Sequence, residues 1–213
     1  MKCPSPAGHG VKGWITVRAP AAGLSHFTEE RLRLLDGLAY RASMALQKAV
    51  LYREQQENAL VANALLEFGR EVAPAKTEED ALSRASELVA RMLEAPRAYV
   101  LLEDDSGDVA IGASYGTDES ARELRFPGDL MRGLLDGDEA FVLSGGAVSE
   151  MLSGAGIDVP RKPLPLVVSP LVLAGGRMGC IVAPGSEPEH EFSELDLRLL
   201  EGMARQAALL ISR

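Results

Sequence analysis

The stretch HFTEERLRLLDGLA, residues 26–39, recurs near the end of the chain as EFSELDLRLLEGMA, residues 191–204, at a constant offset of 165 positions. With one residue of slippage, the preceding residues 13–17 also align with residues 179–183. Self-similarity of this kind indicates a duplicated structural unit. Each copy has the pattern strand, turn, strand, loop and helix, so the sequence predicts the same domain ending twice.

Only the second copy is preceded by enough sequence for a whole domain. We therefore expect residues 1–27 to be the C-terminal hairpin remnant of a preceding domain, and residues 60–213 to form one complete domain. An isolated hairpin is marginally stable in water. Trp14 and its neighbours are thus expected to need a second surface, supplied by another chain or by the adjacent helix.

Residues 28–72 join the two copies and are predicted to form one long connecting helix, because they contain no Pro and only two Gly. Apolar residues recur at three- and four-residue steps at both ends, whereas residues 53–58, REQQEN, are polar all round. A helical segment without an apolar stripe has no core to lie on. We expect two packed ends and a solvated middle that bridges two bodies or supports a parallel helix dimer.

The composition excludes several classes of protein. The 213 residues are 46% hydrophobic and carry a net charge of −9, which repels a phosphate backbone and argues against nucleic-acid binding. No apolar run approaches the ~18 residues of a membrane span, and no export signal is visible. Cys3 and Cys180 are too few for a disulfide framework. We therefore expect a cytoplasmic protein without membrane contact.

The second domain reads as a sequence of alternating helices and strands. Thr77 begins a capping-box-like start to an amphipathic helix, and Ser193 caps a closing helix. Two antiparallel hairpins are predicted at residues 98–115 and 166–183. The region between the hairpins is predicted to contain a polar loop (116–128), a short helix (129–135), a short strand (140–143) and an irregular segment (144–165) with a short helix at 147–152.

These elements predict an α+β fold, a twisted antiparallel sheet with helices on one face, preceded by the long connecting helix. The opposite face of the sheet needs a cover, and only residues 116–165 are available to supply it. A cover of loops and short helices over a sheet commonly encloses a pocket. The sequence therefore predicts a pocket beneath this segment.

The second domain resembles GAF domains. The letters that match the family's C-terminal signature are Ser169-Pro170-Leu171, residues 177–182, Phe192-Ser193, Leu197, Leu199, Leu200, Met203 and Ala204. The letters similar to its first half are Thr77-Glu78-Glu79, residues 98–102 and Asp105-Ser106-Gly107. The resemblance covers roughly residues 60–213, with a second C-terminal piece at residues 3–51, and implies a tandem-GAF signalling protein fragment.

The ligand chemistries known in the family find few of their residues here. Cyclic-nucleotide binders carry an Asn-Lys pair before the Phe and an acidic pair after it, and Phe192 has neither. Bilin attachment needs a Cys beside a pocket helix, whereas Cys180 lies on a predicted strand, and the methionine sulfoxide reductase branch needs several cysteines. Haem binding needs a pocket His, and His190 is interpreted as a solvated loop residue. We expect no cofactor and no metal.

No nucleophile, base and orienting group recur in a recognisable arrangement, so no catalytic residue is assigned and the chain is not expected to be an enzyme. His9 and His26 fall in or beside loops, as His190 does. Cys180 is interpreted as a buried structural thiol rather than a redox sensor. The remaining candidates are Tyr115-Gly116, interpreted as strand-end packing, and Gly175-Gly176, interpreted as a hairpin turn rather than a phosphate cradle.

The resemblance implies a non-catalytic regulatory sensor module of a signal-transduction protein. In this hypothesis the pocket binds a small molecule or a partner, and the change is transmitted through the long helix at residues 28–72. The alternative is a ligand-free dimerisation spacer whose pocket is filled by side chains. We expect a homodimer, with a coiled coil through the connecting helix. A downstream output domain outside this sequence is implied: a kinase, a phosphatase, a cyclic-dinucleotide enzyme or a transcription activator.

Overall fold

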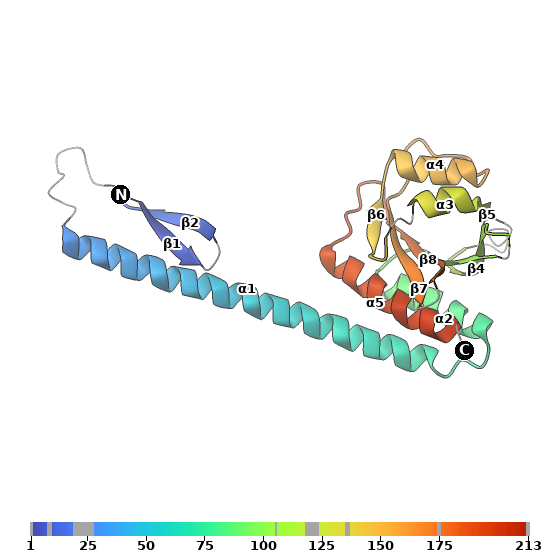
Figure 1. Ribbon diagram of the computed structural model, residues 1–213, viewed down its shortest axis with the longest axis horizontal. Coiled ribbons are helices and arrows are strands. Elements are labelled where there is room, and N and C mark those ends of the chain that lie inside the picture. Colours follow the sequence, from blue (N-terminus) through green and yellow to red (C-terminus); the bar gives the residue numbers. More distant parts are fainter. Residues whose placement is uncertain are drawn as a thin grey trace. The chain divides into compact units, whose positions relative to one another are not determined.

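The computed structural model describes residues 2–7, 10–18, 28–104, 106–117, 124–134, 137–173 and 176–211. The chain divides into two compact units, residues 1–59 and residues 60–213, and each unit has its own sheet. Helix α1, Glu29–Val72, begins in the first unit and ends in the second (Figure 1). Among the described residues, no helix is both long and apolar enough to cross a membrane.

The first unit contains an antiparallel hairpin. Strands β1 (Lys2–Ala7) and β2 (Gly10–Thr16) pair with Pro4 opposite Trp14. The Trp14 side chain is 68% exposed, and Val17 is also exposed. The hairpin forms a two-stranded sheet that shares no strand with the sheet of the second unit.

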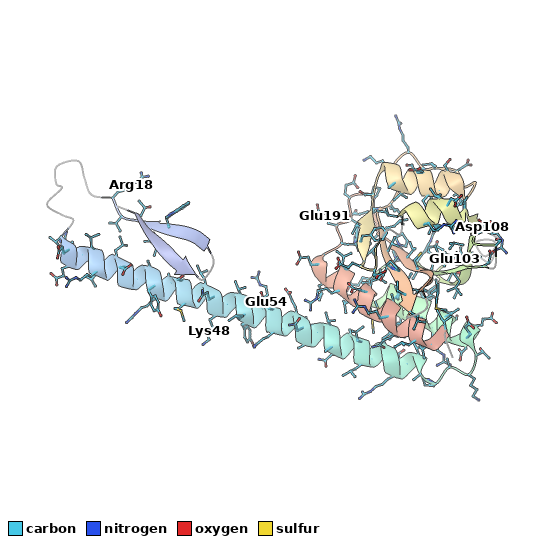
Figure 2. The ribbon with its side chains drawn as sticks, in the orientation of Figure 1. Arg18, Lys48, Glu54, Glu103, Asp108 and Glu191 are labelled. Atoms are coloured by element: carbon cyan, nitrogen blue, oxygen red, sulfur yellow. The ribbon has the colours of Figure 1, made fainter. Side chains whose placement is uncertain are left out.

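Helix α1 confirms the predicted long helix. Its N-terminus is capped by Thr28, whose hydroxyl accepts a hydrogen bond from the Arg31 backbone N–H at 3.4 Å. The helix is continuous through its polar middle, where the Glu54 side chain projects into solvent (Figure 2). In the N-terminal half of the helix, Leu35 and Ala39 are buried within this chain, whereas Leu38 and most of the other apolar side chains of the stripe are exposed.

The second unit is built on a six-stranded antiparallel sheet of order β5-β4-β3-β8-β7-β6. The strands are β3 (Ala98–Glu103), β4 (Val109–Tyr115), β5 (Arg125–Phe126), β6 (Phe141–Leu143), β7 (Leu166–Leu173) and β8 (Gly176–Pro184). Helices α2 (Glu78–Met92) and α5 (Glu194–Ile211) cover one face, and the short helices α3 (Gly128–Leu134) and α4 (Gly146–Gly154) lie over the other (Figure 1). The predicted α+β fold, a twisted antiparallel sheet with helices, is confirmed.

Side chains of the central strands alternate between two cores. On the helix side, Val100 and Ile181 are fully buried in a cluster that includes Phe68 at the end of α1. On the opposite side, Leu101 and Cys180 belong to a second cluster. Because successive residues of a strand point to opposite faces, the two cores share the same strands as a common wall.

The end of α1 packs closely against α5. Gly202 makes this approach possible, because a Cβ at this position would come within 2.6 Å of the Leu65 side chain. One turn further along α1, Gly69 faces Gln206, which a Cβ would meet at 3.1 Å. The last turns of α1 are therefore a structural part of the second unit.

The predicted polar loop at residues 116–128 is wrong at its end, where the short strand β5 forms. Phe126 pairs with Val109 and is buried, and the Arg125 guanidinium lies 2.9 Å from an Asp104 carboxylate oxygen. A hydrogen bond from the Ser106 hydroxyl, with Arg125 nearby, holds the pKa of Asp104 below its usual value. A two-residue strand is too short to show a period in the sequence, so tertiary contacts decide its position.

Gly179 is a position of the central sheet where the fold leaves no room for a side chain. Its φ is +154°, and a Cβ would lie 1.9 Å from the Leu101 carbonyl oxygen on the neighbouring strand. We predict that Gly179→Ala lowers the free energy of unfolding by about 3 kcal/mol or more, measured by urea denaturation.

The matched control is Gly133→Ala in α3, where a Cβ meets nothing within 4 Å. Replacing a helical Gly by Ala is expected to raise the free energy of unfolding by up to about 1 kcal/mol. Equal stabilities for the two variants would contradict the close approach of β8 to β3.

Candidate ligand pocket

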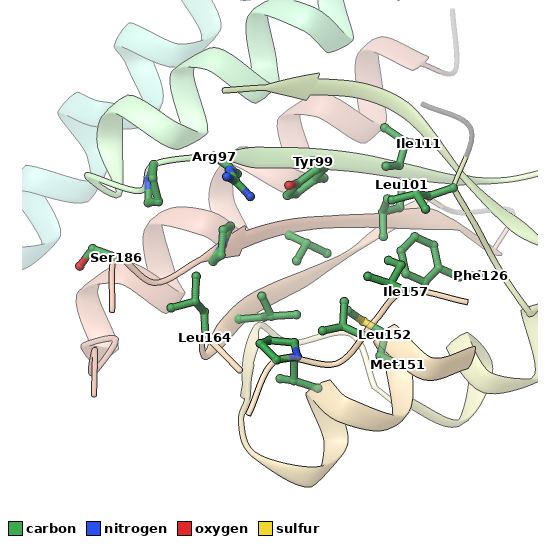
Figure 3. A pocket seen from close by; sticks show the side chains of 17 residues that line it. Arg97, Tyr99, Leu101, Ile111, Phe126, Met151, Leu152, Ile157, Leu164 and Ser186 are labelled. Carbon is green, nitrogen blue, oxygen red and sulfur yellow. The ribbon is translucent and has the colours of Figure 1, made fainter. Parts of the chain in front are cut away.

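A pocket of about 450 Å³ lies between the second face of the sheet and the α4 region (Figure 3). The sheet contributes Tyr99, Leu101, Ile111, Phe126, Leu166, Val182 and Pro184 to its lining. The cover contributes Leu124, Val148, Met151, Leu152, Ile157, Pro160 and Leu164. The pocket therefore lies where the sequence predicted one, beneath the segment at residues 116–165.

The local sequence explains why these side chains face the pocket. Tyr99 and Leu101 occupy alternate positions of β3, so both point away from the helix-side core that buries Val100. On α4, Val148 and Met151 are three residues apart, and Leu152 follows, so all three share one helical face. After α4 the chain turns at Gly156, whose φ is +72°, and returns to the pocket.

The polar groups of the pocket gather toward one end of the sheet. They are the guanidinium of Arg97, the hydroxyl of Tyr99 and the hydroxyl of Ser186, which lies 3.3 Å from Nδ1 of His190. Among the described residues, Arg97 has no hydrogen-bond or ion-pair partner. An uncommitted guanidinium beside an apolar cavity is suited to bind an anionic group of a ligand.

The described lining contains no carboxylate, imidazole or thiol. Within the described parts of the chain, no three His, Cys, Asp or Glu side chains gather as a metal site would require. The titratable side chain of Tyr99 faces the pocket beside Arg97 and Ser186. The lining therefore suits a mainly apolar molecule that meets these few polar groups.

The residues singled out in the sequence do not line the pocket. Cys180 is fully buried in the pocket-side core. His190 lies in a loop, is half-buried, and packs its ring against Phe192 with the centroids 4.5 Å apart. Tyr115 is 44% exposed and lies outside the pocket. Three of the positions named, His9, His26 and Gly175, lie outside the described residues.

Sequence reasoning missed Arg97 and Tyr99. The available signal was their spacing, because a residue two positions before Tyr99 shares its face in an extended chain. The alternation alone does not say which face is the pocket side. That assignment needs the partner strand, where Val182 pairs with Tyr99 and also lines the pocket.

Solved structures of GAF domains share this fold. The GAF domain from an Acinetobacter phosphoenolpyruvate-protein phosphotransferase is similar with a TM-score of 0.58 at 17% identity, covering 71% of this chain and 92% of that one. The phycoerythrobilin-bound GAF domain from a cyanobacterial phytochrome gives 0.53 at 17% identity, covering 71% and 94%. Bacteriophytochrome RpBphP3 from R. palustris gives 0.56 at 14% identity, covering 70% and 36%. At these identities the likeness shows the fold alone.

No curated protein matches the chain by sequence. A family profile described as the GAF domain matches residues 75–212, which is more than half of the chain. This match spans both hairpins, the cover of the pocket and the closing helix α5. The chain therefore belongs to the GAF domain family.

Proposed function

We propose that this chain is a regulatory sensor module of a signal-transduction protein, which binds a small molecule in the pocket and transmits the change through α1. GAF domains are sensor and regulatory modules in signalling proteins such as phytochromes, and they are generally non-catalytic. The observation that carries the proposal is the pocket of about 450 Å³, which is apolar with a few polar groups. Ligand sites typically measure roughly 300–1,000 Å³ and have this composition.

The shared strands offer a route from the pocket to α1. Leu101 lines the pocket, and the adjacent Val100 is buried in the helix-side core. Phe68 of α1 belongs to that same core. In our proposal, a ligand that shifts β3 therefore displaces packed side chains beneath α1.

We further propose that the first part of the chain corresponds to the end of a preceding GAF domain. The repeat aligns Leu34 with Leu199 and Leu38 with Met203. Leu34 and Leu38 are 63% and 60% exposed, whereas Leu199 and Met203 are 9% and 0% exposed. Leu35 and Ala39, which align with the buried Leu200 and Ala204, are themselves buried on α1. The apolar face that α5 buries is therefore repeated on α1 and partly exposed there.

A homodimer through α1 is the second candidate role, either combined with sensing or as a dimerising spacer. Its support is the row of exposed apolar side chains on the N-terminal half of α1, which includes Leu38, Leu46 and Val50. Large exposed apolar patches mark interaction sites. The hollow pocket favours sensing over the spacer alone, because a spacer gains nothing from an unfilled cavity.

Two further features of the proposal concern cellular context. The two cysteines fit a reducing cytoplasm. A regulatory module acts through an output domain, and we propose that a kinase, a phosphatase, a cyclic-dinucleotide enzyme or a transcription activator fulfils this role in the same signalling protein.

Ligand binding is testable by screening metabolites in a thermal-shift assay. A ligand at about 100 times its Kd is expected to stabilise the fold by ~2.7 kcal/mol and to raise Tm by roughly 5–10 °C. Ile157→Trp places a larger side chain in the cavity and is expected to weaken binding of each hit by at least about tenfold.

The matched control is Val159→Trp, two residues along the same segment, where the side chain is exposed and does not line the pocket. Circular dichroism verifies that both variants remain folded. Hits that bind Ile157→Trp as tightly as the parent protein, or a complete absence of hits, would argue against the sensor role.

Association through α1 is testable by sedimentation equilibrium. The double variant Leu38→Glu with Leu46→Glu places two charges on the exposed apolar row and is expected to raise the dimer Kd by at least about a hundredfold. The reason is that burial of each Leu side chain contributes roughly 1.5–3 kcal/mol to the free energy of association. Gln55→Glu with Gln56→Glu adds the same charge in the polar middle and controls for repulsion. A parent protein that stays monomeric at every concentration contradicts the homodimer.

A further inference from the structure

The lining of the pocket changes from polar to apolar along β3. Arg97 directly precedes β3, and Tyr99 and Leu101 follow it at every second residue, so all three side chains face the pocket. At about 3.3 Å per residue, Arg97 and Leu101 are roughly 13 Å apart along the strand. Figure 3 shows Arg97 and Tyr99 pointing into the pocket from one side, and Ile111 and Phe126 at its far side.

The charge of Arg97 is uncompensated within the described part of the chain. Several other arginines of the second unit are paired, as Arg91 is with Glu71 at 2.6 Å and Arg125 with Asp104 at 2.9 Å. Arg70 and Arg161 also have no partner in the described part of the chain, but neither lines the pocket. Arg97 has no such partner there, and neither does the hydroxyl of Tyr99. The planar guanidinium offers paired N–H donors that match the two oxygens of a carboxylate. Tyr99 supplies a third donor on the same face.

The rest of the lining limits the ligand to one charged end. Beyond Arg97, Tyr99 and Ser186, the described lining is apolar. A second ionised group would lie against Leu101 and Phe126 without a partner, which is costly. The hydroxyls of a sugar or the base edges of a nucleotide would meet the same apolar wall.

The size of the cavity limits the length of the ligand. At about 30 Å³ per non-hydrogen atom, the share of one water molecule in the liquid, the pocket holds roughly 15 such atoms. A tetrapyrrole contains far more atoms than this. A chain of about ten carbons ending in a carboxylate fits both this volume and the roughly 13 Å between Arg97 and Leu101.

Resting on the proposed ligand-binding role, we propose that the pocket takes an elongated hydrophobic monocarboxylic acid. The carboxylate lies at Arg97 and accepts hydrogen bonds from its guanidinium and from the Tyr99 hydroxyl. The apolar body extends along β3 toward Leu101 and Phe126. Arg97 determines specificity for the charged end, and the apolar cover supplies most of the affinity.

The test compares decanoate with decanol by isothermal titration calorimetry, using the full chain. These probes have the same carbon chain and differ in the charged end. The parent protein is expected to bind decanoate about tenfold more tightly than decanol, a modest ratio because Arg97 is exposed. Arg97→Gln is expected to remove this preference while changing decanol affinity by less than about twofold. Added salt should weaken decanoate binding only.

The matched control is Arg161→Gln, which removes the same charge from an exposed position outside the pocket lining and should leave the preference intact. Tyr99→Phe is expected to weaken decanoate binding by about threefold. Circular dichroism verifies the fold of each variant.

The outcomes separate this inference from the proposed function. Equal binding of decanoate and decanol, or an Arg97→Gln variant that keeps the preference, overturns the carboxylate assignment. If Ile157→Trp still abolishes binding of either probe, the pocket remains a ligand site and the sensor proposal stands. If neither probe binds but other compounds do, and Ile157→Trp weakens their binding, the assignment of a hydrophobic acid as the ligand is wrong and the sensor proposal again stands. If no compound binds, both fail.

Discussion

The structure of the second unit depends on the pairing of two central strands, β3 and β8, which serve as the wall of two cores at once. Leu101 and Cys180 pair across this contact and face the pocket side, while Val100 and Ile181 pair and face the helices. Gly179 allows the two backbones to approach at the end of the ladder. Any displacement of these strands therefore moves buried side chains on both faces of the sheet.

The two faces are covered differently, and this difference creates the pocket. On the helix side, α2, α5 and the end of α1 fill the space with large buried side chains such as Phe68 and Leu88. On the other side, the cover consists of two short helices and connecting segments. Short elements present fewer side chains to the sheet, so the space between them stays open at about 450 Å³.

Much of the fold was predictable from the sequence because the strongly periodic segments are the ones that pack on the sheet. The predicted strands at residues 98–103 and 109–115 coincide with β3 and β4, and Ser193 caps α5 through its hydroxyl, which accepts from the Asp196 N–H at 3.2 Å. Strand β5 was missed, because two residues carry no period and the Arg125–Asp104 contact that positions them is tertiary.

The location of the pocket was predictable, but its polar groups were not. The need for a cover over one face of the sheet follows from the number of elements, which the sequence shows. The proposed role of Arg97 depends on two observations. Arg97 has no carboxylate partner among the described residues, and the neighbouring Tyr99 faces the pocket side of the sheet. Both facts arise from strand pairing rather than from local sequence. The same limit applies to α1, whose apolar stripe suggested burial that most of its N-terminal half lacks.

The central claim is that a change in the pocket reaches α1 through the shared strands. Hydrogen–deuterium exchange, with and without the compound that gives the largest thermal shift, tests this claim most directly. The account predicts slower exchange in three regions: β3, residues 146–157 of the cover, and residues 60–72 of α1. Slower exchange confined to the cover, with α1 unchanged under saturating ligand, would contradict it.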